Sequence, residues 1–337
     1  MDDMFRYCKS LKELNLSNFR TSNLKSMGGL FYKNNELTSL DISNFNTTQI
    51  SNIDNLFYDC YKIAFLNLSS FDTSNVISMS YMFFYTEDLT SIELSSFNTN
   101  SLLYCDYMFM NAEGLEFLDL SHFDTSQVIT MEGMFYSCYN LSSLEISNFN
   151  TRSVGEMSYM FYDCQSLISL DLSGFNTSSV YFMEGMFKGC KSLISLNLSG
   201  FDISSVYYMG EMFSGCQSLV SLNLNSFTPS SAEDIDQMFC DCQSLVSLNL
   251  DNFNTSSAYS LWAMFYGCQS LISLNLSSFD THEVYDMSQM FYDCRALTSL
   301  DLSSFDTHEV YYMYEMFYDC RSLTSLDLSS FDTSLVS

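Results

Sequence analysis

The chain has 337 residues, with 12 Lys and Arg against 40 Asp and Glu, which gives a formal net charge of −28. A surface this negative repels polyanions, so the composition excludes nucleic acids as partners. Apolar residues make up 47% of the chain, only one proline is present, and no apolar run reaches the ~20 residues of a membrane-spanning helix, which excludes disorder and membrane insertion.

A repeat of about 26 residues fills the chain, and this length lies within the range of known repeat architectures. One phenylalanine column recurs thirteen times without insertion or deletion, at Phe19, Phe45, Phe71, Phe97, Phe123, Phe149, Phe175, Phe201, Phe227, Phe253, Phe279, Phe305 and Phe331. A fixed period of this length is typical of a solenoid, in which each repeat buries its apolar face against the next. The sequence therefore predicts a single array over residues 1–337, and because neither end carries a polar cap we expect it to be part of a longer protein.

Each repeat contains a predicted strand, which the repeat that starts at Met160 illustrates. The segment Leu167-x-x-Leu170-x-Leu172 carries leucines that alternate with Ser169 and Asp171. Alternation with a period of two predicts a short strand with its leucines inside and its polar residues outside. Thirteen such strands would stack into one parallel sheet.

The rest of the repeat predicts a turn, a second extended segment and a helix. Phe175 is expected to point inward, and residues 176–179 are Asn and hydroxyl residues suited to a turn. A short extended segment is predicted to start at Val180. Between Met183 and Cys190 the apolar residues recur at spacings of three and four, which predicts one or two turns of helix. The predicted fold is thus an α/β repeat solenoid of about 13 turns.

The complete repeat motif resembles a known family. The run Met-Phe-x-x-Cys-x-Ser-Leu-x-Ser-Leu-(Asp/Asn)-Leu-Ser-x-Phe-(Asp/Asn)-Thr-Ser-x-Val-x-x-Met is similar to the BspA-like leucine-rich repeats of bacterial and protist surface proteins, and the similarity covers the whole chain. This resemblance implies a right-handed leucine-rich-repeat solenoid. It also implies display at the cell surface, adhesion to proteins or glycans of a host or neighbouring cell, and no catalysis.

Ten of the 12 cysteines occupy one column of the repeat. Eight of them follow one another in consecutive repeats: Cys138, Cys164, Cys190, Cys216, Cys242, Cys268, Cys294 and Cys320. Asn34, Thr86 and Ala112 replace cysteine elsewhere in the column, which favours a small buried slot. We interpret the column as a structural ladder of reduced thiols, with disulfides between neighbouring repeats as the alternative.

A polar column on the outer face of the predicted sheet is the candidate binding site. It contains only Asn, Asp and Glu, including Glu93, Asp119, Glu145, Asp171, Asn197 and Asn223. Serines such as Ser169 and Ser195 flank it. Hydroxyl and carboxylate groups on an exposed face are expected to contact proteins or glycans; binding of a divalent cation to carboxylates in line is the alternative.

The remaining polar residues offer little chemistry. His282-Glu283 and His308-Glu309 occupy equivalent places in neighbouring repeats, but the His-Glu-x-x-His pattern of zinc enzymes is absent. No Gly-x-Ser-x-Gly elbow and no glycine-rich phosphate loop are present. The sequence therefore predicts no enzyme, no cofactor and no metal site.

Tyrosines form two stripes, one after Met-Phe and one after valine, which fit either recognition or structural cover. The second stripe includes Tyr181, Tyr207, Tyr285 and Tyr311. The repeat is least regular near Pro229, Tyr259 and Trp262, where Thr228-Pro229-Ser230 replaces the usual turn and Ala258 replaces valine; these departures mark either a site or sequence drift.

The predicted function is adhesion at the cell surface or outside the cell through the repeat array. An intracellular scaffold with reduced cysteines is the alternative. We expect any leader or anchor segment that would decide between them to lie outside residues 1–337.

Overall fold

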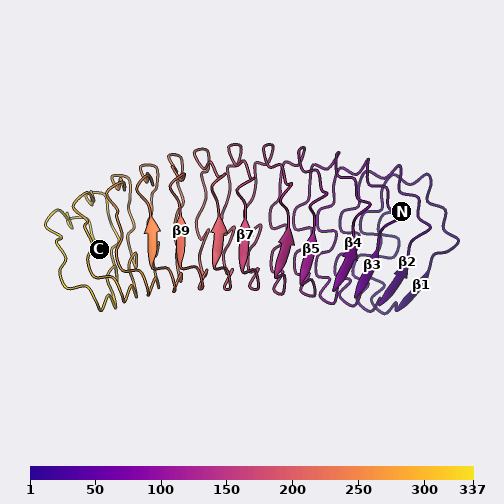
Figure 1. Cartoon of the computed structure of the whole chain (residues 1–337), viewed down its shortest axis with the longest axis horizontal. Helices are drawn as coiled ribbons and strands as arrows, with labels where there is room; N and C mark the ends of the chain where they lie inside the picture. Colours follow the sequence, from indigo (N-terminus) through magenta and orange to yellow (C-terminus); the bar gives the residue numbers. More distant parts are fainter. The chain divides into compact units, whose positions relative to one another are not determined.

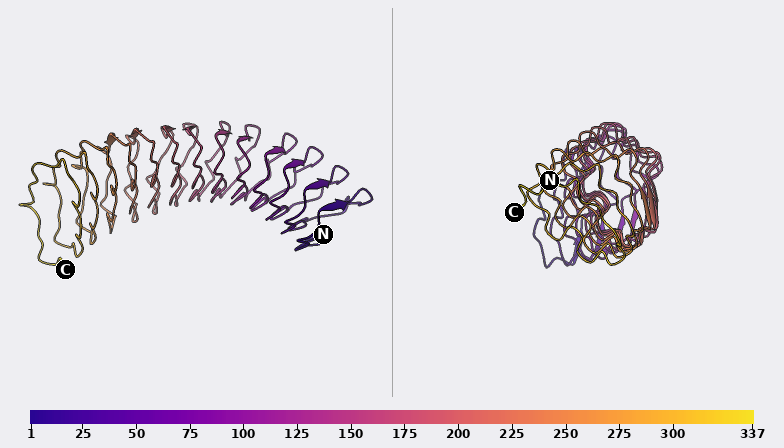
Figure 2. Two further views of the ribbon diagram at one scale, coloured as in Figure 1. Left: turned by 90° about the horizontal axis from the view of Figure 1, so that it is seen from below. Right: turned by 90° about the vertical axis from the view of Figure 1, so that its left-hand side faces the viewer.

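The computed structural model describes all 337 residues as two compact units, Met1–Leu167 and Ile168–Ser337. The strands of the first unit are β1 (Glu13–Asn15), β2 (Ser39–Asp41), β3 (Phe65–Asn67), β4 (Ser91–Glu93), β5 (Phe117–Asp119) and β6 (Ser143–Glu145). Those of the second are β7 (Ser169–Asp171), β8 (Ser195–Asn197), β9 (Ser221–Asn223) and β10 (Ser247–Asn249). Within each unit, successive turns of the chain lie side by side and their strands share one direction (Figures 1 and 2).

The strands pair in parallel with a register offset of one repeat. Leu14 lies opposite Leu40 in the β1–β2 pair, and Leu170 lies opposite Leu196 in the β7–β8 pair. The central residue of every strand is buried or half-buried, while both flanking residues are exposed. Each unit is therefore a parallel β-solenoid with one repeat in each turn, as the sequence predicts.

The number of strands differs from the prediction. The ten strands span nine turns, and no regular strand forms around Leu274, Leu300 or Leu326. The backbone hydrogen bonds between the strand positions of these last repeats are reduced to one, from Thr298 N–H to Ile272 C=O at 3.1 Å. The chain there is extended but does not complete a ladder.

The predicted helix is also wrong, because the structure contains no helix. In the segment predicted as helical, Gly185 and Gly189 have φ angles of 55° and 74°, in the left-handed region that ends a right-handed helix. The N–H of Phe187 donates to the carbonyl of Met212 in the next turn at 2.9 Å, whereas the N–H of Lys188 donates back to Gly185 at 3.0 Å. Alternate amides thus bond to the next turn, which an α-helix does not allow. No helix is present with the length and apolar character needed to cross a bilayer.

The core of each unit is a stack of identical side chains. In the first unit, the rings of Phe57, Phe83 and Phe109 are separated by 5.8 and 5.3 Å between centroids, and all three are fully buried. In the second unit, Phe213 and Phe239 stack at 5.6 Å with their planes 6° apart. Each such pair adds about 0.5–1.5 kcal/mol to the free energy gained by burying the rings.

A second parallel ladder runs along each unit on the wall that follows the valine column. It consists of isolated bridges, such as Ser78 with Tyr104 in the first unit and Tyr208 with Asp234 in the second. This ladder corresponds to the second extended segment predicted from the sequence, and it positions the valine-stripe tyrosines on the outside of the solenoid.

Candidate functional site

The structure places the predicted binding residues on the open face of the strands. Ser169 and Asp171 flank the buried Leu170 in β7, and both are exposed. Ser195 and Asn197 of β8 lie in register with them. Asn223 ends β9 in the same way. This part of the second unit therefore presents a hydroxyl column beside an amide and carboxylate column.

Most members of the polar column also cap the turn that follows their strand. Oδ1 of Asp171 accepts a hydrogen bond from the N–H of Ser173 at 3.0 Å, and the N–H of Ser173 is the main reason that the pKa of Asp171 lies below its usual value. Asn197 and Asn223 accept from the residue two positions later at 3.2 and 3.1 Å. The alternation of Asn with Asp in this column follows from the shared turn geometry, since both side chains have the required oxygen.

The carboxylates of the first unit behave in the same way, with one exception. Glu93 accepts from the N–H of Ser95 at 3.0 Å and Asp119 from the N–H of Ser121 at 2.9 Å, and contacts with these serines lower the pKa of both acids. The side chain of Glu145 makes no hydrogen bond, and Glu145 lies in register with Asp119. No group of three or more His, Cys, Asp or Glu side chains is arranged to hold a metal ion anywhere in the chain.

The cysteine column lies inside the solenoid except at its two ends, where Cys8 is exposed and Cys320 is half-buried, and none of the 12 cysteines forms a disulfide. The Sγ–H of Cys242 donates to the carbonyl of Phe213 at 3.1 Å, and Cys268 donates to Phe239 at the same distance. Equivalent contacts recur at Cys138, Cys164, Cys216, Cys294 and Cys320. Cys190 lies buried in the same column. Each thiol thus supplies a weak donor to a buried carbonyl of the preceding turn.

The two tyrosine stripes differ in their surroundings. Most tyrosines that follow Met-Phe are half-buried against one another, as in the pairs Tyr136–Tyr162 at 4.3 Å and Tyr266–Tyr292 at 4.6 Å, although Tyr318 is exposed. Tyrosines of the valine stripe are more accessible: Tyr207 is 41% exposed and Tyr259 is 47% exposed. The half-buried tyrosines of the first stripe therefore serve as structural cover, and the second stripe is available for contacts.

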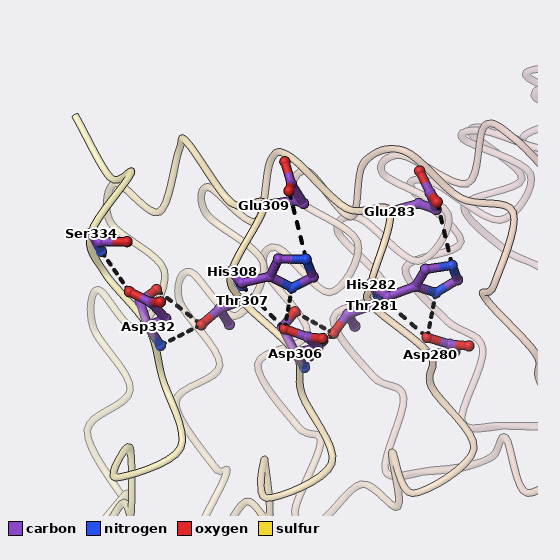
Figure 3. Close-up of polar contacts among 10 residues, drawn as sticks. All are labelled: Asp280, Thr281, His282, Glu283, Asp306, Thr307, His308, Glu309, Asp332 and Ser334. Atoms are coloured by element: carbon purple, nitrogen blue, oxygen red, sulfur yellow. Dashed lines mark hydrogen bonds and ion pairs between the residues drawn. The ribbon is translucent and has the colours of Figure 1, made fainter.

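The two histidines are held within their own repeats (Figure 3). Nδ1 of His282 lies 2.7 Å from Oδ1 of Asp280, and Nδ1 of His308 lies 2.6 Å from Oδ1 of Asp306. These contacts raise the pKa of both imidazoles above the usual value, chiefly through the hydrogen bond to the aspartate. The other nitrogen of His282 lies 3.4 Å from the carboxylate of Glu283.

A row of buried threonines is a structural feature that the sequence analysis missed. Oγ1 of Thr281 donates to the carbonyl of Asp306 at 2.8 Å and accepts from the N–H of the same residue at 2.8 Å, as Figure 3 shows. Thr307 bridges to Asp332 in the same way. The signal was visible in the sequence, because threonine is nearly constant at this position while the residue before it alternates between Asn and Asp.

Comparison with protein families covers the entire chain. One family model, described as Mycoplasma protein of unknown function, DUF285, matches residues 1–65, 62–143, 115–221, 166–272 and 233–337. The chain belongs to this family. Its repeats are those of the BspA-like leucine-rich repeat proteins that the sequence resembles. No curated protein matches this DUF285 chain.

Solved structures share the fold of this DUF285 protein. A leucine-rich repeat protein from Bacteroides ovatus is 19% identical, with a TM-score of 0.51 over 90% of this chain and 70% of that chain. A leucine rich cell surface protein from Faecalibacterium prausnitzii is 17% identical, with a TM-score of 0.46 over 91% of this chain and 84% of that chain. At this level of identity the first similarity establishes the leucine-rich-repeat fold and nothing about ligands.

Proposed function

We propose that this chain is a non-enzymatic interaction module, displayed at the cell surface or outside the cell, that binds proteins or glycans of a host or partner cell through its repeat array. The observation that carries the proposal is the strand face. Each of the ten strands exposes both residues that flank its central position, so a similar surface recurs from strand to strand within each unit. Apart from the exposed Phe65 and Phe117, the flanking residues of these strands are polar. A repeated surface suits polyvalent contact, in which several weak contacts add up to a stable attachment.

The binding residues proposed on this face are those predicted from the sequence. In the second unit the proposed binding residues are Ser169, Ser195, Asp171, Asn197 and Asn223. In the first unit they are Glu93, Asp119 and Glu145, of which Glu145 has both carboxylate oxygens free for a ligand. Serine hydroxyls can donate and accept, and the capping carboxylates keep one oxygen each for a partner.

The location of the protein is tested on intact source cells. An antibody to the array should label unpermeabilised cells, and brief protease treatment should remove the label. A signal that appears only after permeabilisation would contradict surface display.

The binding face is tested by a matched pair of variants that change the net charge equally. Ser169→Arg with Ser195→Arg places two bulky side chains on the strand face, whereas Ser178→Arg with Ser204→Arg places them on exposed turns elsewhere. We expect the first pair to abolish attachment of the labelled array to partner cells and the second to preserve it, with both proteins folded by circular dichroism. Equal attachment of the two variants would place the site away from the strand face.

A second candidate function is an intracellular scaffold for protein–protein interaction. The observation that favours it is that none of the 12 cysteines forms a disulfide, because thiols persist in reducing compartments. The permeabilisation experiment separates this candidate from the first.

A further inference from the structure

A groove of about 480 Å³ lies in the second unit, away from the strand face. Its lining residues are Tyr207, Tyr259, Glu233, Glu283 and three serines. The groove lies on the outer side of the second ladder, and both of its tyrosines are exposed.

The ladder holds Glu233 between the two tyrosines. The N–H of Glu233 donates to the carbonyl of Tyr207 at 2.9 Å, and the N–H of Tyr259 donates to the carbonyl of Glu233 at 3.4 Å. Glu233 therefore occupies the turn between them. From Tyr181 to Tyr311 this column of the repeat is otherwise tyrosine, so the carboxylate at Glu233 interrupts an aromatic stripe.

The repeat departs from its pattern at the same turns. Pro229 and Ile203 replace the threonine that elsewhere bridges neighbouring turns. Ala232 and Ala258, which directly precede Glu233 and Tyr259, replace the usual valine and are fully buried. Smaller residues under the ladder and a changed turn beside it coincide with the groove, which favours a site over drift as the explanation of these irregular repeats.

Only one of the two carboxylates in the groove has an ion-pair partner within the chain. No Lys or Arg forms an ion pair with Glu233, and the ion-pair partner of Glu283 is the half-exposed His282. Two aromatic faces beside two carboxylates are the elements of a cation site, because the face of a tyrosine ring attracts a positive charge and a carboxylate binds guanidinium through paired hydrogen bonds. The whole-chain charge of −28 attracts basic partners to this surface.

We propose that this groove binds an arginine side chain presented by a partner protein. The guanidinium lies between the rings of Tyr207 and Tyr259 and donates to the carboxylates of Glu233 and Glu283. The proposal rests on the proposed interaction function and names one anchor for it. Arginine suits the groove better than lysine because its planar group can stack on a ring and bond to a carboxylate at once.

The test uses the full chain and a fluorescent tetra-arginine peptide, with the tetra-citrulline peptide as a neutral analogue of the same shape. We expect Glu233→Gln to weaken binding of tetra-arginine about tenfold, the change that corresponds to loss of a single charge-assisted contact, and Tyr259→Ala to weaken it similarly. The matched controls are Glu309→Gln and Tyr311→Ala, since these exposed residues lie outside the groove, Glu309 at the place equivalent to Glu283 and Tyr311 at the place equivalent to Tyr259. The controls should bind within about twofold of the unchanged protein at 0.15 M salt, where distant charges are screened.

Three results would overturn the assignment. Equal losses for Glu233→Gln and Glu309→Gln would show diffuse attraction to an acidic surface. Binding of a neutral oligosaccharide that Tyr259→Ala abolishes and Glu233→Gln leaves intact would identify a sugar site. Attachment to partner cells is measured for the same variants. If all variants bind the peptide equally and still attach to cells, the groove is rejected as the arginine site while the proposed function stands.

Discussion

Asp236 is a half-buried carboxylate with a raised pKa, and it gives a pH-dependent prediction at the scale of one residue. Burial, together with the charges of Asp234 and Asp286, raises its pKa to about 6. Since this value lies above that of the unfolded chain, ionisation of Asp236 destabilises the folded state, fully above pH 6 and not at all once the pH falls below about 4.

We therefore expect Asp236→Asn to stabilise the protein by about 1–2 kcal/mol at pH 8, because the amide keeps the acceptor for the N–H of Trp262 without the charge. The measurement is the thermal unfolding midpoint at several pH values. The gain should shrink as the pH falls from 6 to 4, and a gain of the same size at pH 4 and pH 8 would show that charge is not its cause.

The cysteines allow a second prediction at the residue scale. Cys8 is exposed, whereas Cys138 is buried, and burial raises the pKa of the Cys138 thiol to about 12. Because the thiolate is the reactive form, a thiol reagent should modify Cys8 within minutes and the buried column only after denaturation. Mass spectrometry of the native protein, with Cys8→Ser as the control, checks this; rapid modification of Cys138 would show that the column opens in the native state.

The threonine bridge gives the prediction at the scale of the structural element. In Thr281→Val the side chain keeps its shape but loses both hydrogen bonds to Asp306, leaving a backbone N–H and C=O without their partner. We expect a loss of about 1–3 kcal/mol in stability and faster hydrogen exchange at the amide of Asp306.

The control for this change is Thr298→Val, because Thr298 is exposed and its hydroxyl makes one contact of 3.3 Å. Unchanged exchange at Asp306 in Thr281→Val would mean that the bridge does not hold the two turns together.

At the scale of the whole molecule, the distribution of charge decides the response to salt. Residues 1–62 contain seven basic and seven acidic side chains, so the remaining five basic and 33 acidic residues carry the net charge of −28. Like charges stacked at every turn repel one another in the folded state, and salt screens this repulsion. We expect the unfolding midpoint to rise by several degrees between about 10 mM and 200 mM NaCl, with most of the gain below about 100 mM. A midpoint that falls or stays constant would show that favourable ion pairs offset the repulsion.

The sequence by itself determined the features that depend on periodicity. Residue types at fixed intervals are enough to give the constant length of the repeat, the alternation around Leu170 and the inward phenylalanine column. They also give the membership of the repeat family. When the same residue type recurs in every repeat, its polarity shows whether that position faces the core or the solvent. For the same reason the sequence identified the polar strand face, though not the capping bonds that occupy one oxygen of Asp171.

The tertiary structure decided where the backbone hydrogen bonds go. The spacing between Met183 and Cys190 fits a helix, yet the amides there bond to the next turn, and two residues per repeat adopt the left-handed conformation to allow it. The spacing of apolar residues by three and four is a local pattern, and it does not show that the backbone amides have hydrogen-bond partners in the next turn of the solenoid. The groove at Glu233 likewise exists only because stacking brings Tyr207 and Tyr259 to the two sides of one irregular turn, so its chemistry belongs to neighbouring repeats together and to no single one.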